Sequence, residues 1–161
     1  MSQTLQTPDA HRHALRVRVA KRAQAEAIGI DEDFVSDMVE RFYASIREDE
    51  LLGPIFAERI DEWPPHLSRM KQFWRSILHN SGDFSGNPMV KHIAIPGLTE
   101  RHFSRWLELF YANLHQMNLD ARAVQLVGDR ARMIADSLLT GISVQRDGIG
   151  GAIERKDLPH V

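Results

Sequence analysis

The sequence contains no cysteine among its 161 residues. That absence excludes disulfide bonds, thiolate ligands to zinc or to an iron–sulfur cluster, and a cysteine nucleophile. Any metal must therefore be bound by histidine, carboxylate or methionine side chains. Against the missing cysteines stand eight histidines. The chemistry of this chain has to come from imidazole, from carboxylate or from a bound cofactor.

An excess of charge of one sign is also lacking, and so are long apolar runs. The 20 lysines and arginines nearly balance 22 acidic residues, and the net charge of -2 provides no field that would attract nucleic acid. No apolar run approaches the roughly 20 residues that span a bilayer, and the N-terminus is not of signal-peptide type. We therefore predict no nucleic-acid partner, no membrane span and a cytoplasmic location.

Several catalytic motifs are missing as well. The sequence has no H-E-x-x-H pair, no glycine-rich phosphate loop, no nucleophile elbow and no calcium-loop pattern. Its carboxylates lie mainly where helix surfaces and first helical turns are expected, which is typical of solubility and capping. Hydrolase and kinase functions therefore have no support.

What is present is a helical pattern over most of the chain. Apolar residues recur at intervals of three and four, and no alternating strand pattern of useful length exists, so the fold class is predicted to be all-α. A turn is expected at Gly53 and Pro54, and a loop over residues 81–88. Asn87 is expected to cap a very short helix that ends before Pro96. Four substantial helices are expected over residues 31–47, 61–78, 99–114 and 120–142.

The length fits a single core, flanked by two segments of different composition. Residues 1–28 carry a net charge of +3, which leaves -5 for the rest of the chain. This basic extension is expected to form a partly ordered helix on the surface, and an organelle transit peptide is the alternative. Residues 29–145 are expected to form the folded domain. Residues 146–161, which include three glycines and a proline, are predicted to be a flexible tail.

Two histidines have positions that call for an explanation. His66 shares a helical stripe with Phe73 and Trp74, so its imidazole points toward the core. There it must be hydrogen-bonded or ligated, because an unpaired buried polar group costs about 1–3 kcal/mol. His92 lies on the short helix, which contributes little packing. The alternative for both is a structural histidine with a protein or water partner.

Two aromatic residues add hydrogen-bond donors to the same core. Tyr43 and Trp106 each fall on the inward stripe of an expected helix. Both could be core residues whose polar ends reach the surface. Together with His66 and His92, however, they would line an apolar pocket with four polar groups, which is typical of a site for a flat apolar cofactor with a central metal.

At these residues the sequence resembles the truncated hemoglobins, and specifically their group III. The resemblance covers about residues 30–142 and depends on the order and spacing of five blocks. It implies a shortened globin fold in which two antiparallel helix pairs are stacked around heme b, with a very short proximal helix. The matching blocks are RFYASIREDELLGPIF (41–56), EWPPHLSRMKQFWRSIL (62–78), GDFSGNPMVKH (82–92), IPGLTERHFSRWLELF (95–110) and RARMIADSL (130–138).

The resemblance also implies roles for individual residues. His92, in the PMVKH motif, is the expected proximal ligand of the heme iron, and Tyr43, His66 and Trp106 are the expected hydrogen-bond donors to a bound gas. A sixth iron ligand from the protein, if there is one, is expected to be His66 or, less readily, Met70. Contacts to the heme are expected from Phe42, Phe56, Leu67, Met70, Phe73, Trp74, Met89, Phe103, Trp106, Ile134 and Leu138, and contacts to its propionates from Arg69, Lys91 and Arg105.

The function implied is reversible binding of O2, and of NO, at a heme iron. Three donors around one ligand favour retention and redox chemistry on the bound gas over oxygen transport. NO dioxygenase or peroxidase-like activity would need an external reductase, which the sequence does not identify. One alternative is a gas sensor or partner-binding module whose basic extension docks an acidic partner. Another is an all-α domain in which the histidines are structural.

Overall fold

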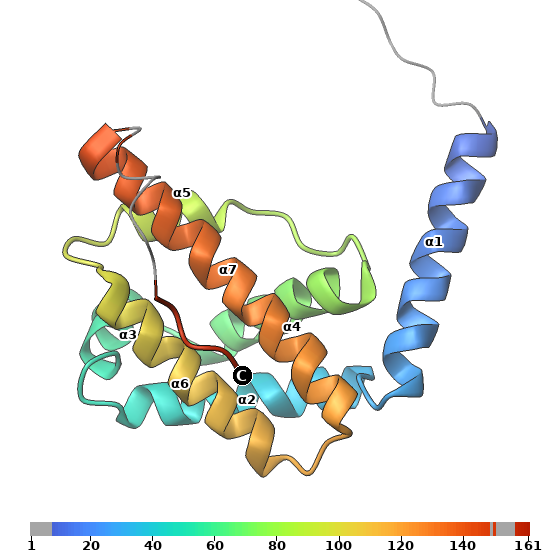
Figure 1. The fold of residues 1–161 in the computed structure, drawn as a ribbon, viewed down its shortest axis with the longest axis horizontal. Coiled ribbons are helices and arrows are strands. Elements are labelled where there is room, and N and C mark those ends of the chain that lie inside the picture. The colour runs from blue at the N-terminus through green and yellow to red at the C-terminus, as the bar shows by residue number, and fades with distance from the viewer. Residues whose placement is uncertain (1–7, 149, 151–156) are drawn as a thin grey trace, which may run out of the picture.

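The computed structural model describes residues 8–148, 150 and 157–161 and confirms the all-α class. Within those residues the chain forms seven helices and no strand (Figure 1). None of these helices combines the length and the apolar character that crossing a membrane requires. The helices are α1 (Pro8–Ala27), α2 (Glu32–Glu48), α3 (Gly53–Arg59), α4 (Trp63–His79), α5 (Pro88–Ile93), α6 (Glu100–Gln116) and α7 (Ala121–Asp147).

Four long helices enclose the core. Helix α2 packs against α4 and α6, α6 packs against α7, and the short α5 packs against α7. The inward stripes expected from the sequence are buried: α2, for example, buries Phe34, Val35, Met38, Val39, Phe42, Tyr43 and Ile46. Burial of such stripes, at about 25 cal/mol per Å² of apolar surface, is the main force that holds the helices together.

Local sequence signals set where α2 and α3 begin. The Oδ1 atom of Asp31 accepts a hydrogen bond from the backbone N–H of Phe34 at 2.8 Å, which caps α2. The turn expected at Gly53 and Pro54 is the first turn of a short helix, α3, because proline is tolerated at that position. A Cβ atom on Gly53 would lie 2.9 Å from the carbonyl oxygen of Arg47. Glycine therefore allows α3 to start directly against the end of α2.

Helix α5 follows a loop, as the sequence predicts. Helix α4 ends at Asn80, whose φ of 53° is left-handed, and residues 80–87 form no helix. Asn87 then accepts a hydrogen bond from the backbone N–H of Val90 at 3.4 Å and caps the six-residue α5. The side chain of Met89 packs directly on Gly141 of α7, where any larger residue would meet its sulfur atom. The lack of a side chain at Gly141 thus lets α5 lie close against α7.

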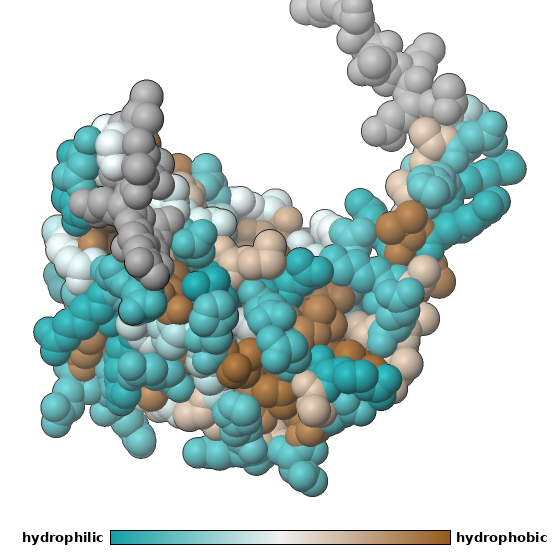
Figure 2. Space-filling view, in the orientation of Figure 1, coloured by the Kyte–Doolittle hydropathy of each residue, from teal (hydrophilic) through white to brown (hydrophobic). Residues whose placement is uncertain are grey.

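The basic extension forms one regular helix over nearly all of its described residues. Helix α1 starts at Pro8, packs against α4 near its C-terminal end, and otherwise projects away from the other helices (Figure 1). Ala25 is its only buried residue among those described. Apolar side chains interrupt its polar surface (Figure 2), and they include Leu15, Val17 and Val19.

The predicted flexible tail, residues 146–161, lies partly outside the described residues, and the part that is described contacts the helices. Helix α7 continues to Asp147, and residues 157–161 run along α6 and α7 (Figure 1). Leu158 is only 2% exposed, and its neighbour Pro159 accepts a hydrogen bond from the Tyr111 hydroxyl at 2.8 Å. One buried leucine and these contacts hold this segment in place, and its composition does not reveal them.

Candidate functional site

A cavity of about 660 Å³ lies among helices α2 to α7. Its volume is in the range of about 300–1,000 Å³ that is typical of small-molecule and cofactor pockets. Most of the side chains that line it are apolar, and a few polar groups come from different helices. Those named in the sequence analysis that line it are Tyr43, Phe56, His66, Arg69, Met70, Phe73, Trp74, Lys91, His92, Phe103, Trp106, Ile134 and Leu138.

His92 reaches this cavity from α5 with its ring oriented by the backbone. Its Nδ1 atom lies 2.6 Å from the carbonyl oxygen of Pro88, which can only accept, so Nδ1 donates. The other ring nitrogen, Nε2, is thereby left with a lone pair. Burial lowers the pKa of His92 and outweighs the opposing effect of the Pro88 hydrogen bond, so the neutral imidazole is favoured. A neutral imidazole held in this way is the form that binds a metal.

His66 lines the same cavity from α4 and has an unsatisfied nitrogen. Its Nε2 atom is buried and has no hydrogen-bond partner among the described residues. Burial lowers the pKa of His66, and the charges of Lys91 and Arg69 lower it further. The ring is therefore neutral at pH 7. A buried, unpaired nitrogen in a cavity is costly unless a ligand or a water molecule completes it.

Tyr43 and Trp106 bring two further donors to the cavity, from α2 and α6. Burial raises the pKa of Tyr43 well above its usual range, so its hydroxyl keeps the proton and can donate a hydrogen bond. The Trp106 ring is fixed by Phe110, against which it is stacked at 5.5 Å between centroids. Phe42 contacts Trp106 edge-on at 5.2 Å. Tyr43 and Trp106 thus pack against other aromatic rings of the core.

Cations cluster around the same cavity. Lys91 lines it, and so does Arg69, whose guanidinium lies 3.5 Å from the carbonyl oxygen of Ser85 and over the ring of Phe84. Arg59 is a third cation that lines it, and the imidazole of His102, whose pKa is lowered by burial, lines it in the neutral form; the sequence predicts neither contact. These groups could bind carboxylates of an apolar cofactor.

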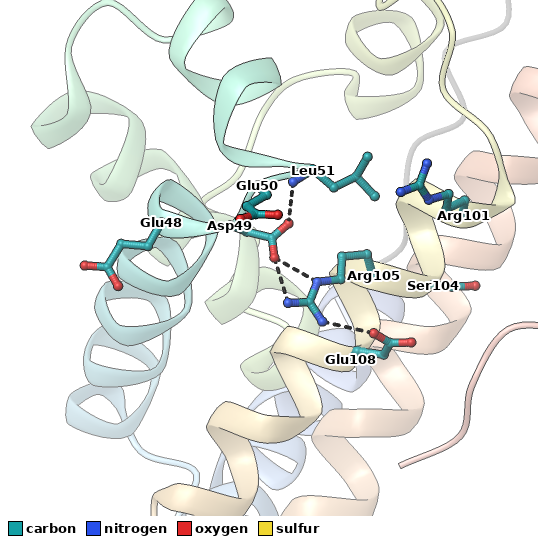
Figure 3. A pocket seen from close by; sticks show the side chains of 8 residues that line it. All are labelled: Glu48, Asp49, Glu50, Leu51, Arg101, Ser104, Arg105 and Glu108. Atoms are coloured by element: carbon teal, nitrogen blue, oxygen red, sulfur yellow. Dashed lines mark hydrogen bonds and ion pairs between the residues drawn. The ribbon is translucent and has the colours of Figure 1, made fainter.

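Arg105, the third cation predicted to contact propionates, is engaged elsewhere. It lies in a separate cleft with Asp49 and Glu108 (Figure 3). The Oδ1 atom of Asp49 accepts from Nε of Arg105 at 2.8 Å and pairs with a second guanidinium nitrogen at 2.7 Å. Glu108 lies 3.2 Å from the same guanidinium. Arg105 is next to Trp106 in sequence, but adjacent residues on a helix point about 100° apart.

Asp49 is itself held by the backbone. Its Oδ2 atom accepts hydrogen bonds from the N–H groups of Leu51 and Leu52, at 3.2 and 3.0 Å. Burial alone would raise the pKa of Asp49, but the hydrogen bonds from Arg105 and from these N–H groups outweigh it and hold the pKa below its ordinary value. This carboxylate therefore ties the turn after α2 to α6.

Three other predicted contacts also lie outside the cavity lining. Phe42 packs behind Tyr43, against Phe110 at 5.1 Å between ring centroids. Met89 faces Gly141 of α7 rather than the cavity. Leu67 packs against the core without lining the cavity. Phe42 and Met89 thus contact neighbouring helices, α6 and α7.

Several lining residues that the sequence does not predict lie outside the long helices. They come from α3, from the loop before α5 and from the turn after it. An apolar residue between turn formers, as in GDFSG around Phe84, was a usable signal for the loop. The lining residues in these segments that the sequence does not predict include Leu52, Ile55, Arg59, Ile60, Phe84, Ala94, Ile95 and Leu98, and two more, His102 and Ala135, lie on the long helices α6 and α7.

Comparisons with known proteins agree with this geometry. The chain matches the family model described as bacterial-like globin over residues 25–137. It is 35% identical to the group 3 truncated hemoglobin ctb of Campylobacter jejuni over 111 residues, which are 66% of this chain and 86% of that protein.

Solved structures give the same result. A crystal structure of the group III truncated hemoglobin from Campylobacter jejuni matches with a TM-score of 0.64 at 32% identity, over 68% of this chain and 89% of that one. The 2/2 hemoglobin from Synechococcus sp. PCC 7002, solved in the cyanomet state with covalently attached heme, matches with a TM-score of 0.63 at 20% identity, over 73% and 95% of the two chains. The second match concerns the fold alone. The truncated globin fold expected from the sequence is thereby confirmed.

Proposed function

Because this chain belongs to the bacterial-like globin family and, within it, to the group III truncated hemoglobins, we propose that it binds O2, and also NO, reversibly at heme b in the cavity of α2 to α7. Membership in this family implies heme-based gas binding. Heme supplies an iron that binds a diatomic gas and can exchange an electron with it. The observation that carries the proposal is the orientation of His92 by Pro88 at the wall of an apolar cavity.

The residues of the cavity suit a bound heme in three ways. His92 offers a neutral Nε2 with a free lone pair for the proximal position. Apolar walls such as Phe73 and Leu138 match a flat apolar ring. Arg69 and Lys91 provide positive charge for two propionates. Arg59 is a further cation for that contact, and the neutral imidazole of His102 can offer a hydrogen-bond donor there.

Three donors in the cavity can interact with a bound gas. Tyr43 keeps its proton because it is buried, and the indole N–H of Trp106 cannot accept. His66 has an unpaired, buried Nε2 atom. Whether Nε2 carries the proton depends on whether the group that it meets accepts or donates a hydrogen bond. Donors that are fixed before the ligand arrives stabilise the negative charge that builds up on dioxygen. We infer slow release of the gas.

Slow release of O2 favours a redox reaction of the bound gas over oxygen transport. The reaction we propose joins NO and O2 to give nitrate, and reduction of peroxide is the alternative. A separate reductase supplies the electrons, one for each nitrate formed or two, together with two protons from water, for each peroxide reduced. In this chain, Tyr43, His66 and Trp106 hold the ligand, while the apolar walls exclude water from it.

An absorption spectrum of the purified protein tests heme binding directly. We expect an intense Soret band near the blue edge of the visible range, and retention of the heme on a desalting column. A protein that stays colourless after heme is added would overturn the proposal. Stopped-flow kinetics of the reduced protein with O2 and with NO, together with nitrate yield, then separate a carrier from an enzyme.

A second candidate function concerns α1. This helix carries Arg12, Arg16, Arg18, Lys21 and Arg22 against two acids, and most of it lies outside the matched residues 25–137. It projects from the body and exposes Leu15 and Val19 (Figure 2). An isolated helix gains little stability from propensity alone, so a partner surface would stabilise it. We propose that α1 docks on an acidic protein partner and thereby couples gas binding to it.

Removing residues 1–24 tests this second function. Gas binding should be unchanged, because the heme cavity is lined by α2 to α7. Capture of an acidic partner, in a pull-down at low salt, should be lost and should also weaken as salt rises. If the shortened chain captures the same partner equally well, α1 is not the docking element.

A further inference from the structure

Trp63, the first residue of α4, contacts two of the proposed donors without lining the cavity. Its ring centroid lies 5.7 Å from that of His66, at 90°, and 6.1 Å from that of Tyr43, at 57°. We propose that Trp63, itself held by Arg47, is a positioning residue that fixes the orientation of His66 beside Tyr43. This inference rests on the proposed gas-binding function, whose donors it concerns.

The four residues form two pairs on facing helices. Tyr43 and Arg47 are four residues apart on α2, and Trp63 and His66 are three residues apart on α4, so each pair lies on one helix face. Arg47 lies over the Trp63 ring at 4.5 Å from its centroid, and Tyr43 meets His66 edge-on at 5.2 Å. The rings of Tyr43, Trp63 and His66 thus contact one another in a triangle, and Arg47 covers the Trp63 ring.

Ring packing is the main restraint on His66. Its Nε2 atom has no hydrogen-bond partner among the described residues, so no hydrogen bond at that atom fixes the imidazole in place. Edge-to-face ring contacts have preferred geometries and therefore set orientation as well as separation. Without Trp63 the imidazole loses one of its two ring neighbours and gains space to rotate.

Trp63 is well suited to orient His66 because both its backbone and its ring are restrained. Pro64 and Pro65 follow it, and a proline restricts the backbone of the residue before it as well as its own. The guanidinium of Arg47 adds a cation–π contact to the ring. The sequence EWPPH therefore joins a fixed aromatic ring to a histidine one turn later.

The experiment compares Trp63→Ala, Trp63→Phe and Arg47→Gln, with Arg41→Gln as the matched control. Arg41 is also an exposed arginine of α2, but its partner is Asp37. The first readout uses the heme-free protein: the pKa of His66, followed by NMR, should rise toward its ordinary value in Trp63→Ala and stay unchanged in Trp63→Phe. Arg47→Gln should show the same change to a smaller extent.

The second readout uses the CO complex of the heme-loaded protein. We expect the C–O stretching band, which senses donors near the ligand, to broaden or split in Trp63→Ala and to stay narrow in Trp63→Phe and Arg41→Gln. Release of O2 should accelerate about two- to tenfold in Trp63→Ala, the range that one ordinary hydrogen bond covers.

The results distinguish this inference from the proposed function. A Trp63→Ala protein that folds and keeps both the His66 pKa and the wild-type CO band would overturn it. If Trp63→Ala does not fold, Trp63→Leu and Arg47→Gln carry the test, and wild-type behaviour of both would overturn it as well. A wild-type protein that binds no heme would overturn the proposed function, while the NMR readout on His66 would still decide the role of Trp63.

Discussion

His92 donates its Nδ1 proton to the carbonyl oxygen of Pro88, four residues earlier, at 2.6 Å. Pro88 thereby has two tasks: it starts the six-residue α5, and it orients the ring that faces the cavity. The bond is internal to one helical turn, so the ring orientation does not depend on any distant element. Even on so short a helix, His92 therefore presents an oriented imidazole to the cavity.

Replacing His92 with glycine should abolish heme retention. The ligand to the iron is lost, and even residues that only support a metal ligand typically cost 10- to 100-fold in affinity, so we expect a loss of more than about 100-fold. Imidazole added to the solution should restore binding, because the space left by the side chain can hold it. Heme titration monitored at the Soret band measures both effects. Replacement of the exposed His160 with alanine is the control, and heme retention in His92→Gly without imidazole would contradict the assignment.

Tyr43→Phe should leave heme bound but accelerate the release of O2. The substitution removes only the buried hydroxyl, whose raised pKa keeps it a donor at all ordinary pH values. A hydrogen bond to a charged acceptor contributes about 1.5–3 kcal/mol, which corresponds to roughly 10- to 100-fold in the dissociation rate. Stopped-flow displacement of O2 by CO gives that rate. An unchanged rate would mean that Tyr43 does not contact the ligand.

The sequence predicts helices better than it predicts which way a residue on a helix points. The stripe of α2 contains both Phe42 and Tyr43, but an apolar stripe is at least 100° wide, so one residue can face a neighbouring helix and the next the cavity. Phe42 packs on Phe110, and Tyr43 lines the cavity. Met89 shows the same limit, because its partner Gly141 is 52 positions away and local spacing does not reveal it.

Residues outside the helices were the hardest to predict. Phe84 and Leu98 line the cavity from segments without regular periodicity, and the only local signal was the apolar residue between turn formers at Phe84. His92 could be found because the short helix that carries it is bounded by Asn87, Pro88 and Pro96, all readable signals. These signals place His92 on its short helix, its predicted role as the heme ligand comes from the family resemblance, and the remainder of the cavity depends on tertiary packing.

The heme-free protein should lose stability as the pH falls from 7 to 5. Burial lowers the pKa of His66, His92 and His102 in the folded state, with smaller contributions from neighbouring cations. Below about pH 6.5 the unfolded chain therefore binds more protons than the folded one, and unfolding is favoured. Above pH 7 these groups should contribute no further change. Urea unfolding at pH 5, 6, 7 and 8 measures the trend, and stability that rises toward pH 5 would contradict it.

Arg105→Gln should destabilise the protein without affecting heme retention. The substitution leaves the Asp49 carboxylate, whose side chain is 5% exposed, with its two backbone donors but without a guanidinium. We expect a loss of about 1–2 kcal/mol in the free energy of unfolding, within the range for one unsatisfied buried group. Glu108→Gln, which removes only an exposed pair, should change it by less than about 0.5 kcal/mol. Weaker heme binding in Arg105→Gln would instead support the propionate contact expected from the sequence.

The C-terminal segment should contribute measurably to stability. Leu158 is buried to 2% exposure, and the two hydrogen bonds that it and Pro159 accept come from Arg132 and Tyr111. Leu158→Ala should cost about 2 kcal/mol, the low end for a buried leucine, because a terminal segment can shift to fill the space. Urea unfolding of this variant measures the loss, and His160→Ala, at an exposed position of the same segment, should leave stability unchanged.

The contact between this segment and α7 can be tested with Gly128. A Cβ atom at Gly128 would lie 2.6 Å from the side chain of Val161, so Gly128→Ala must displace the end of the chain. Within a helix, however, alanine is favoured over glycine by about 1 kcal/mol. Gly128→Ala should therefore stabilise a chain that ends at residue 156 and give a smaller gain, or a loss, in the full chain. A double-mutant cycle isolates the difference, because both versions share the same change in helix propensity. Equal effects in the two chains would mean that Val161 does not pack on Gly128 in solution.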